Sequence, residues 1–248
     1  ATKFKNYDQH LVFESMNEEF DGTYGTPSST AYANINAYNQ IFVDTVRQTG
    51  GNNAKRWLMI PGWNTNITYT VGNYGFSLPT DNYRDSSIST PRIMISVHYY
   101  DPWDFCGEES SNVTQWGDTA TNSSKISSWG DESALKSQFS SLYNKFVAAG
   151  YPVVIGEYGS IDKSAYDSTS AAQRAEFAKK VCTYAKKYGM VPVLWDNGYT
   201  GTYGFGVIDR STCKVTQQKI IDAIASVYPK SSSSNSSNSS ASSLEGTY

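Results

Sequence analysis

Five short hydrophobic runs recur along the chain, and each has the length of one strand. Within the runs the hydrophobic residues are largely continuous, whereas a strand with one face in water alternates hydrophobic and polar residues. The runs are residues 10–16, 56–61, 93–100, 152–156 and 191–195. This pattern predicts a parallel sheet whose strands are buried on both faces.

Longer segments with helical spacing lie between these runs. In residues 30–48, the apolar residues Ile35, Phe42 and Val46 fall on one face of a helix. Residues 170–188 end in lysines followed by a glycine, as is typical of a helix C-terminus. The expected helices are residues 30–48, 131–149, 170–188 and 214–227. The repeated order of strand and helix predicts an α/β fold with right-handed crossovers.

Polar or aromatic side chains stand at the C-terminal end of all five runs. This is typical of a closed (β/α)8 barrel, in which many strand ends surround one mouth. An open doubly wound sheet concentrates its site at one switch point and usually has a glycine-rich phosphate turn, which this sequence lacks. The residues are Asn17 and Glu18; Trp63 and Asn64; His98 and Tyr100; Glu157; and Trp195, Asp196 and Asn197. We therefore predict a (β/α)8 TIM barrel, of which the chain holds about the last five βα units.

Composition and charge limit the domain organisation and the partners. Of the 248 residues, 39% are hydrophobic and 17% are charged, so we expect one soluble domain over residues 1–230. The net charge of −3 gives no reason to expect nucleic acid or a membrane surface as a partner, and no apolar stretch is long enough to span a membrane. Residues 231–248 form a Ser/Asn-rich tract, which we interpret as a flexible linker to a carbohydrate-binding or docking module.

Two features favour an extracellular protein that binds sugars. Aromatic residues make up 14% of the chain, and aromatic surfaces suit the flat, weakly polar faces of sugar rings. Five N-x-Ser/Thr sequons are compatible with secretion; they begin at Asn66, Asn112, Asn122, Asn235 and Asn238. We therefore expect a secreted protein.

The cysteines and histidines indicate no cofactor. Cys106, Cys182 and Cys213 are too few for a disulfide framework, so at most one pair forms, and Cys182 with Cys213 is one candidate. The chain has only two histidines and no acid cluster with ligand spacing, so we expect neither a metal nor another cofactor.

Two glutamates, Glu18 and Glu157, each follow directly after a hydrophobic strand. A glycosidase needs such a pair, because one acid protonates the leaving oxygen and the other attacks the anomeric carbon. Either glutamate alone could instead cap a helix or pair with an arginine. His98 and Tyr100 point the same way from an extended strand, and Trp195 adds an aromatic platform, so the set as a whole favours a catalytic site.

Four motifs resemble glycoside hydrolase family 5, the family of endoglucanase-type cellulases. They are "NE" at 17–18, "H-x-Y" at 98–100, "GE" at 156–157 and "W-D-N" at 195–197. The longer phrases "FESMNE", "HYYDPW", "IGEYG" and "LWDNG" look most like its broad subgroup of bacterial and anaerobic-fungal endoglucanases. The resemblance runs from residue 11 to about residue 225 and implies that the motifs lie on the fourth, sixth, seventh and eighth barrel strands.

The resemblance implies a retaining mechanism with Glu18 as general acid/base and Glu157 as nucleophile, at a carboxylate separation of roughly 5 Å. It also implies that Asn17 binds the sugar 2-hydroxyl. Donors near Glu157 would favour its ionised form, and apolar burial of Glu18 would favour its protonated form.

The other site residues have roles that the resemblance also implies. Tyr100 would orient the nucleophile, His98 would contact the sugar or the acid/base, and Trp195 would lie under the sugar ring.

Three further tryptophans could stack on additional sugar units. Trp63 directly follows a strand, and Trp103 and Trp116 lie in the long loop after His98. Loops at the mouth of a barrel usually build its cleft, so we expect Trp63 and Trp103 to bind substrate. The alternative is that these rings pack inside the loop.

The first motif departs from the family pattern, because Glu19 stands where the family usually has proline. We expect Glu19 to be solvated or to start a helix. Glu14 is expected to be a buried partner of a basic group.

The early position of the first motif suggests a fragment. The family barrel has three βα units before it, which contribute an Arg and a His to the same sugar site, and the present chain has only ten residues before the stretch "LVFESMNE". We expect the N-terminal barrel strands to be missing and the chain alone to be poorly stable and weakly active.

The predicted function is hydrolysis of internal β-1,4-glucosidic bonds in cellulose or related β-glucan polysaccharides. A mannanase or xyloglucanase on the same scaffold is an alternative, because the catalytic residues do not encode the sugar. An inactive sugar-binding protein is another, which the glutamate pair disfavours because binding alone needs no acid pair.

Overall fold

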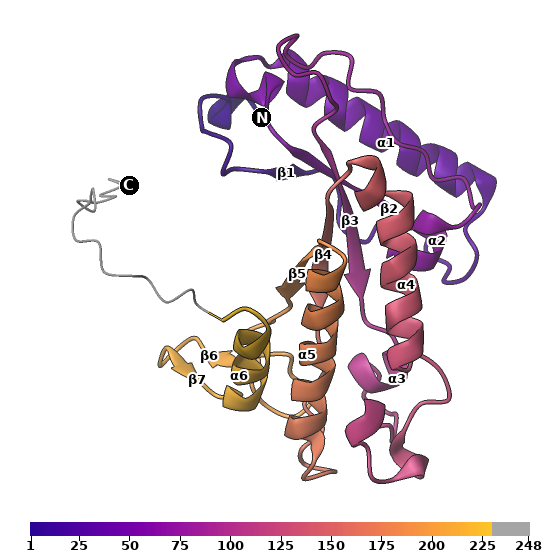
Figure 1. Ribbon diagram of the computed structural model, residues 1–248, viewed down its shortest axis with the longest axis vertical. Coiled ribbons are helices and arrows are strands. Elements are labelled where there is room, and N and C mark those ends of the chain that lie inside the picture. The colour runs from indigo at the N-terminus through magenta and orange to yellow at the C-terminus, as the bar shows by residue number, and fades with distance from the viewer. Residues whose placement is uncertain (230–248) are drawn as a thin grey trace.

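A five-stranded parallel sheet forms the centre of the molecule (Figure 1). The computed structural model describes residues 1–229. The strands are β1 (Phe13–Glu14), β2 (Leu58–Asn66), β3 (Ile93–Tyr99), β4 (Val153–Tyr158) and β5 (Val191–Leu194). Their order in the sheet is their order in the chain, without the reversal that defines a doubly wound sheet. This confirms the predicted succession of barrel βα units, five of which are present in the described residues.

Helices connect the strands, and four of them overlap the expected segments 30–48, 131–149, 170–188 and 214–227. The α-helices are α1 (Ser29–Gln48), α2 (Ile67–Val71), α3 (Trp103–Cys106), α4 (Glu132–Lys145), α5 (Ser170–Lys187) and α6 (Gln218–Val227). Short 3-10 turns are η1 (Thr2–Phe4), η2 (Gly51–Ala54), η3 (Gly117–Thr119), η4 (Ser123–Lys125) and η5 (Val147–Ala149). Ser28 and Asp131 cap the starts of α1 and α4 through their side-chain oxygens. None of the helices within residues 1–229 has the length and hydrophobicity that a membrane span requires.

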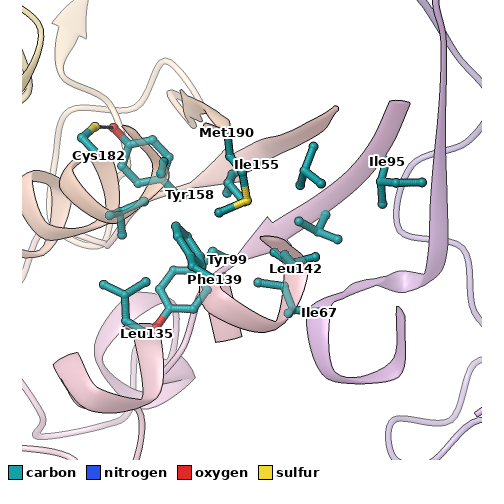
Figure 2. Close-up of a cluster of buried hydrophobic side chains, with 14 of the residues drawn as sticks. Ile67, Ile95, Tyr99, Leu135, Phe139, Leu142, Ile155, Tyr158, Cys182 and Met190 are labelled. Atoms are coloured by element: carbon teal, nitrogen blue, oxygen red, sulfur yellow. Dashed lines mark hydrogen bonds between the residues drawn. The ribbon is translucent and has the colours of Figure 1, made fainter. Parts of the chain in front are cut away.

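Strand β3 shows how the alternation of side chains divides core from site. Ile95 and Tyr99 point to the helices and are fully buried, and Tyr99 meets Phe139 of α4 edge to face with ring centroids 5.2 Å apart (Figure 2). His98, on the opposite face of the same strand, points toward the interior of the curved sheet. The hydrophobic core therefore lies between the sheet and its helices.

The outer strands of the sheet differ from the prediction. The pattern predicted burial on both faces, but Val191 and Val193 of β5 are 57% and 46% exposed, and Glu14 of β1 is exposed. Within the described residues β1 and β5 each have one neighbouring strand, so their interior faces remain open. The expectation of a buried Glu14 paired with a base is therefore wrong.

The boundaries of one strand and one helix also differ from the prediction. The strand predicted at 10–16 is paired only over β1, and the helix predicted at 214–227 begins later, because Lys214–Val215 (β7) pairs with Ile208–Asp209 (β6) as an antiparallel hairpin. The candidate disulfide between Cys182 and Cys213 is wrong, since Cys182 is buried beside the Tyr158 hydroxyl and Cys213 is exposed. The predicted linker, residues 231–248, lies outside the described residues.

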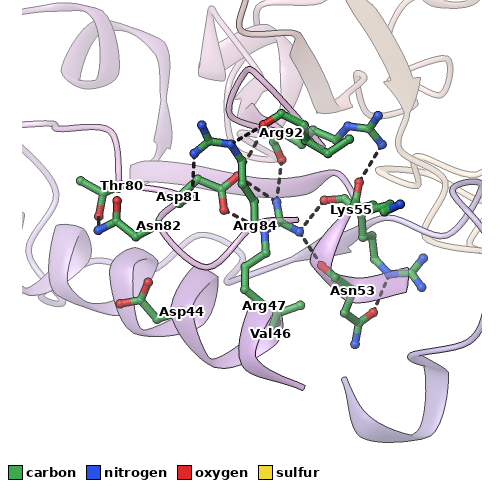
Figure 3. A network of polar contacts seen from close by, with 12 residues as sticks. Asp44, Val46, Arg47, Asn53, Lys55, Thr80, Asp81, Asn82, Arg84 and Arg92 are labelled. Atoms are coloured by element: carbon green, nitrogen blue, oxygen red, sulfur yellow. Dashed lines mark hydrogen bonds and ion pairs between the residues drawn. The ribbon is translucent and has the colours of Figure 1, made fainter. Parts of the chain in front are cut away.

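A buried arginine joins the helix α1 to the beginnings of two strands (Figure 3). Arg47 forms a bidentate ion pair with Asp81, with Nε 2.7 Å from Oδ1, and neither side chain is exposed. Its Nη1 also donates to the carbonyl oxygens of Asn53 and Arg56, at 2.6 and 2.7 Å, and Nη2 donates to that of Arg92. Buried charge is tolerated here because every side of the guanidinium has a partner.

A second polar cluster holds the long loop between β3 and α4. The carboxylate of Asp167 accepts hydrogen bonds from Thr114, Gln115, Lys125 and Thr169. Burial by itself would raise the pKa of Asp167, but the hydrogen bonds outweigh it and hold that pKa well below its ordinary value of 3.8. The ionised carboxylate therefore fastens the loop to the start of α5.

Lys163, which is buried with 2% exposure, also fixes this loop. Its Nζ donates to the carbonyl oxygens of Asp104 and Val113, both at 2.9 Å, and to that of Ser111 at 3.2 Å. These bonds fix the residues that directly follow Trp103.

Replacement of Arg47 tests the first cluster. We expect Arg47→Met to lower the free energy of unfolding by about 3–5 kcal/mol, because it leaves Asp81 as an unpaired buried charge. Lys55→Met is the control, since Lys55 is half exposed and pairs with Asp85 at 3.5 Å, and it should cost no more than about 1 kcal/mol. Denaturant unfolding of both variants measures the difference, and equal losses would contradict the assignment.

Replacement of Asp167 tests the second cluster through pH. A carboxylate with a lowered pKa stabilises the fold above the unfolded-state pKa near 3.8, and this contribution is lost as the pH falls below it. Asp167→Asn should therefore destabilise the protein by about 2 kcal/mol or more at pH 6, with a difference that shrinks below about pH 4. A difference that stays constant from pH 6 to pH 3 would exclude this origin. Thermal unfolding at each pH provides the measurement.

Candidate functional site

The two strand-end glutamates meet around one imidazole. His98 Nδ1 lies 2.7 Å from Oε1 of Glu18 and 3.5 Å from Oε2 of Glu157. One side-chain atom from each of the three residues lies within 4.8 Å of the other two. His98 and Glu157 are register partners on β3 and β4, so the sheet itself brings them together.

Irregularities in the strands help to aim these side chains. The register shifts between Val97 and His98 in the pairing of β3 with β4. Such bulges redirect side chains at the mouths of barrels. Gly156, the residue before Glu157, lies against the ring, since a Cβ there would be 3.3 Å from His98 Nε2. A larger residue at 156 would push on the imidazole.

Tyr100 binds the second glutamate directly. Its hydroxyl donates to Oε2 of Glu157 at 2.7 Å. Burial, reinforced by this hydrogen bond, raises the pKa of Tyr100 well above its ordinary value of 10. The phenol therefore remains protonated and stays a donor to the carboxylate.

Glu18, His98 and Tyr100 border a cleft of about 370 Å³. This volume lies within the range of sites that bind small organic ligands. The cleft is lined by Glu18, Tyr24, Asn64, Asn66, His98, Tyr100, Asp101 and Trp103. Four predicted site residues, Glu18, His98, Tyr100 and Trp103, thus come together, and Trp103 is 49% exposed.

Glu18 has a different environment from the one predicted. The expected apolar burial is wrong, because its side chain is 42% exposed and contacts His98 in the open cleft. The Glu157 side chain is 18% exposed. Glu19 is exposed, as predicted, and its backbone carbonyl accepts from Asn64 N–H at 2.9 Å.

Two predicted binding residues, Asn17 and Trp195, do not line this cleft. Asn17 is exposed next to Glu18. Trp195 is 40% exposed at the end of β5, where its backbone N–H donates to the Tyr158 carbonyl at 2.9 Å. Both lie at the same carboxyl edge of the sheet as the glutamates.

Two of the tryptophans are buried and pack against other aromatic side chains. Trp63 is only 1% exposed and packs against Phe20 and Tyr69, so the prediction that it stacks on sugar is wrong. Trp116 is 2% exposed, packs edge to face on Phe177 and donates to a backbone carbonyl. Here the alternative of a packed loop is correct.

Four cleft residues were not among the predicted site residues. Asn64 follows a predicted strand, and Asp101 adjoins the H-x-Y motif, so sequence position could have suggested both. Burial raises the pKa of Asp101, which accepts a hydrogen bond from Gln138 at 2.9 Å. Tyr24 lies in a loop without any motif, and the only sequence signal at Asn66 is that it begins a sequon.

By distance alone, Glu18, His98 and Glu157 could also hold a metal ion. Acidic groups at a surface often lie this close without one. The same arrangement suits proton transfer, because it places one carboxylate beside an imidazole and the other beside a phenol.

Comparison with known proteins gives a family. Residues 1–201 match the family model described as cellulase (glycosyl hydrolase family 5). Endoglucanase A of Paenibacillus barcinonensis is 63% identical over 226 residues, which are 90% of this chain and 56% of the relative. A xyloglucan-specific endo-beta-1,4-glucanase of Bacteroides ovatus is 34% identical over 86% of this chain and 41% of its own length.

Solved structures agree with these sequence matches. A family 5 xyloglucanase from Paenibacillus pabuli, in complex with a ligand, has 65% identity and a TM-score of 0.89, covering 91% of this chain and 64% of that one. A broad-specificity endoglucanase from Bacteroides salanitronis has 37% identity and a TM-score of 0.81, covering 92% and 60%. The chain spans about half the length of the curated relatives it matches.

Proposed function

This chain belongs to glycoside hydrolase family 5, and we propose that it carries both catalytic glutamates of a retaining endo-β-1,4-glucanase. The substrate is a β-glucan polysaccharide that is cut at internal bonds.

The closeness of the two glutamates carries this proposal. Reactive side-chain atoms of Glu18 and Glu157 lie within 4.8 Å of each other. Retaining glycosidases hold their carboxyl groups about 5–5.5 Å apart, whereas inverting enzymes leave about 6.5–9.5 Å for a water molecule. The short separation supports direct attack by a carboxylate on the sugar.

The reaction then proceeds in two displacements. Glu157 attacks the anomeric carbon while Glu18 gives a proton to the departing glycosidic oxygen, which leaves a glycosyl ester on Glu157. Glu18, now ionised, takes a proton from water, and the water oxygen replaces Glu157 at the anomeric carbon. The exposed side chain of Glu18 is accessible to that water.

The neighbouring residues support these two roles. Tyr100 occupies Oε2 of Glu157 and leaves Oε1 for attack on the sugar. His98 contacts Glu18 and orients it. Asn17 binds the sugar 2-hydroxyl, and Trp195 lies under the sugar ring.

A xyloglucanase is the second candidate within the same mechanism. The similar structure from Paenibacillus pabuli is described as a xyloglucanase, whereas the similar Paenibacillus barcinonensis protein is named Endoglucanase A. Initial rates on tamarind xyloglucan and on carboxymethylcellulose would separate the two.

Secretion is part of the proposal, because a polysaccharide of this kind is too large to enter a cell. The five sequons are compatible with export. We also propose that the Ser/Asn-rich residues 231–248 join the catalytic part to a carbohydrate-binding or docking module.

The stereochemistry of the product tests the retaining mechanism. With the protein expressed at its natural length, proton NMR during cellotetraose hydrolysis should detect the β-anomer first. Initial release of the α-anomer would contradict the double displacement.

Substitution of the glutamates tests their roles. Glu157→Gln should lower kcat by roughly 10³-fold or more while oligosaccharide binding is kept, because only the nucleophile is lost. Glu19→Gln is the matched control, because Glu19 is an exposed acid directly after Glu18, and this variant should retain activity. Turnover is followed by reducing-sugar release and binding by calorimetry; an active Glu157→Gln variant would exclude the assignment.

Tyr100→Phe tests the support of the nucleophile. Loss of a hydrogen bond to a charged group costs about 1.5–3 kcal/mol, so we expect kcat to fall about 10- to 100-fold. The phenyl ring preserves the packing, and the melting temperature should change little. Steady-state kinetics on a soluble β-glucan provide the measurement, and an unchanged kcat would show that the bond at Glu157 is dispensable.

A further inference from the structure

The cleft lies on one side of the two glutamates. Its walls come from the loop after β1 and from the ends of β2 and β3, whereas Glu157 is on β4 and Trp195 follows β5. Glu18 lines the cleft, and Glu157 does not. Because the acid gives its proton to the departing oxygen, sugar units in this cleft belong to the leaving group.

Tyr24 projects into this cleft as a fixed aromatic surface. It is 77% exposed, yet its ring stacks on Phe20 with centroids 4.6 Å apart and an interplanar angle of 26°. Phe20 in turn rests edge to face on buried Trp63, at 5.7 Å. Trp63 and Phe20 thus support one face of Tyr24 from beneath and leave the rest of the ring uncovered.

Amide groups beside the ring supply polar contacts. Asn64 and Thr65 have φ values of 50° and 49°, in the left-handed region, at the register shift near the end of β2. Such backbone conformations are uncommon for residues other than glycine and cluster at functional sites. Among residues 1–229 the Asn64 side chain has no hydrogen-bond partner, and it faces the cleft. An apolar ring beside a free amide matches a sugar, which has apolar C–H faces and hydroxyls at its edge.

We propose that Tyr24 is the surface on which the leaving-group sugar stacks, and that Asn64 binds its hydroxyls. This inference rests on the proposed function and deepens it. Trp103, which is 49% exposed, also lines this cleft.

The same site binds an acceptor sugar after the first product leaves. The hydroxyl oxygen of the acceptor attacks the anomeric carbon of the glycosyl ester, its proton passes to Glu18, and the ester bond to Glu157 breaks. A new glycosidic bond forms and both glutamates return to their starting states. Tyr24 therefore sets the ratio of sugar transfer to hydrolysis.

Two substrates that differ only in the leaving group test this assignment. Cellopentaose places sugar in the cleft, whereas β-cellobiosyl fluoride has a leaving group too small to reach Tyr24. In the protein at its natural length, Tyr24→Ala should lower kcat/KM for cellopentaose about three- to ten-fold and leave fluoride release within about two-fold. With cellobiose added as acceptor, the ratio of cellotetraose formed to fluoride released should fall by a similar factor.

Matched variants separate stacking from folding. Tyr24→Phe keeps the ring and should stay within about two-fold of the parent in all three measurements. Tyr83→Ala removes another exposed tyrosine, 53% exposed near the start of β3, and should change none of them. Unchanged fluoride release by Tyr24→Ala also shows that this variant is folded.

The results distinguish failure of this inference from failure of the proposed function. Suppose that the parent is active and that Tyr24→Ala loses activity equally on both substrates, or on neither. The role of Tyr24 is then wrong, and the proposed function stands. A parent that hydrolyses neither substrate would overturn the proposed function and this inference with it.

Discussion

The alternation of side chains along β3 is the constraint on which the rest of the structure depends. Tyr99 enters the core against Phe139, and its two neighbours His98 and Tyr100 turn to the opposite face. One strand therefore anchors the helices and also provides the contacts to Glu18 and Glu157. A change that slipped its register by one residue would bury the imidazole in the core and expose the hydrophobic face.

Buried cations keep the surroundings of this strand in place. Arg47 and Lys163 are each 2% exposed, and backbone carbonyl groups take up much of their hydrogen-bonding capacity. Arg47 holds the beginnings of β2 and β3, whereas Lys163 holds the loop that carries Trp103. Loops do not have the repeating hydrogen bonds of a sheet, so the bonds from Lys163 fix the loop that carries Trp103 into the cleft wall.

The aromatic residues divide into a supporting layer and a contact layer. Trp63 and Trp116 lie beneath the surface, and Tyr24 and Trp103 lie on it. The stack from Trp63 through Phe20 to Tyr24 shows why both layers are needed, since an exposed ring is useful for binding only if its orientation is fixed. The high aromatic content therefore serves packing and the proposed sugar binding together.

The sequence by itself determined the parallel strand order, the main helices and the family, because hydrophobic periodicity and short strand-end motifs are local properties of the chain. It also predicted that Glu18, His98 and Tyr100 would meet, since parallel strands place their carboxyl ends at one edge. Only the tertiary structure decided that Trp63 is buried and Tyr24 exposed, because burial depends on residues distant in sequence. For the same reason the open surroundings of Glu18 could not be read from its neighbours in the chain: they follow from where the loop after β1 lies relative to β2 and β3.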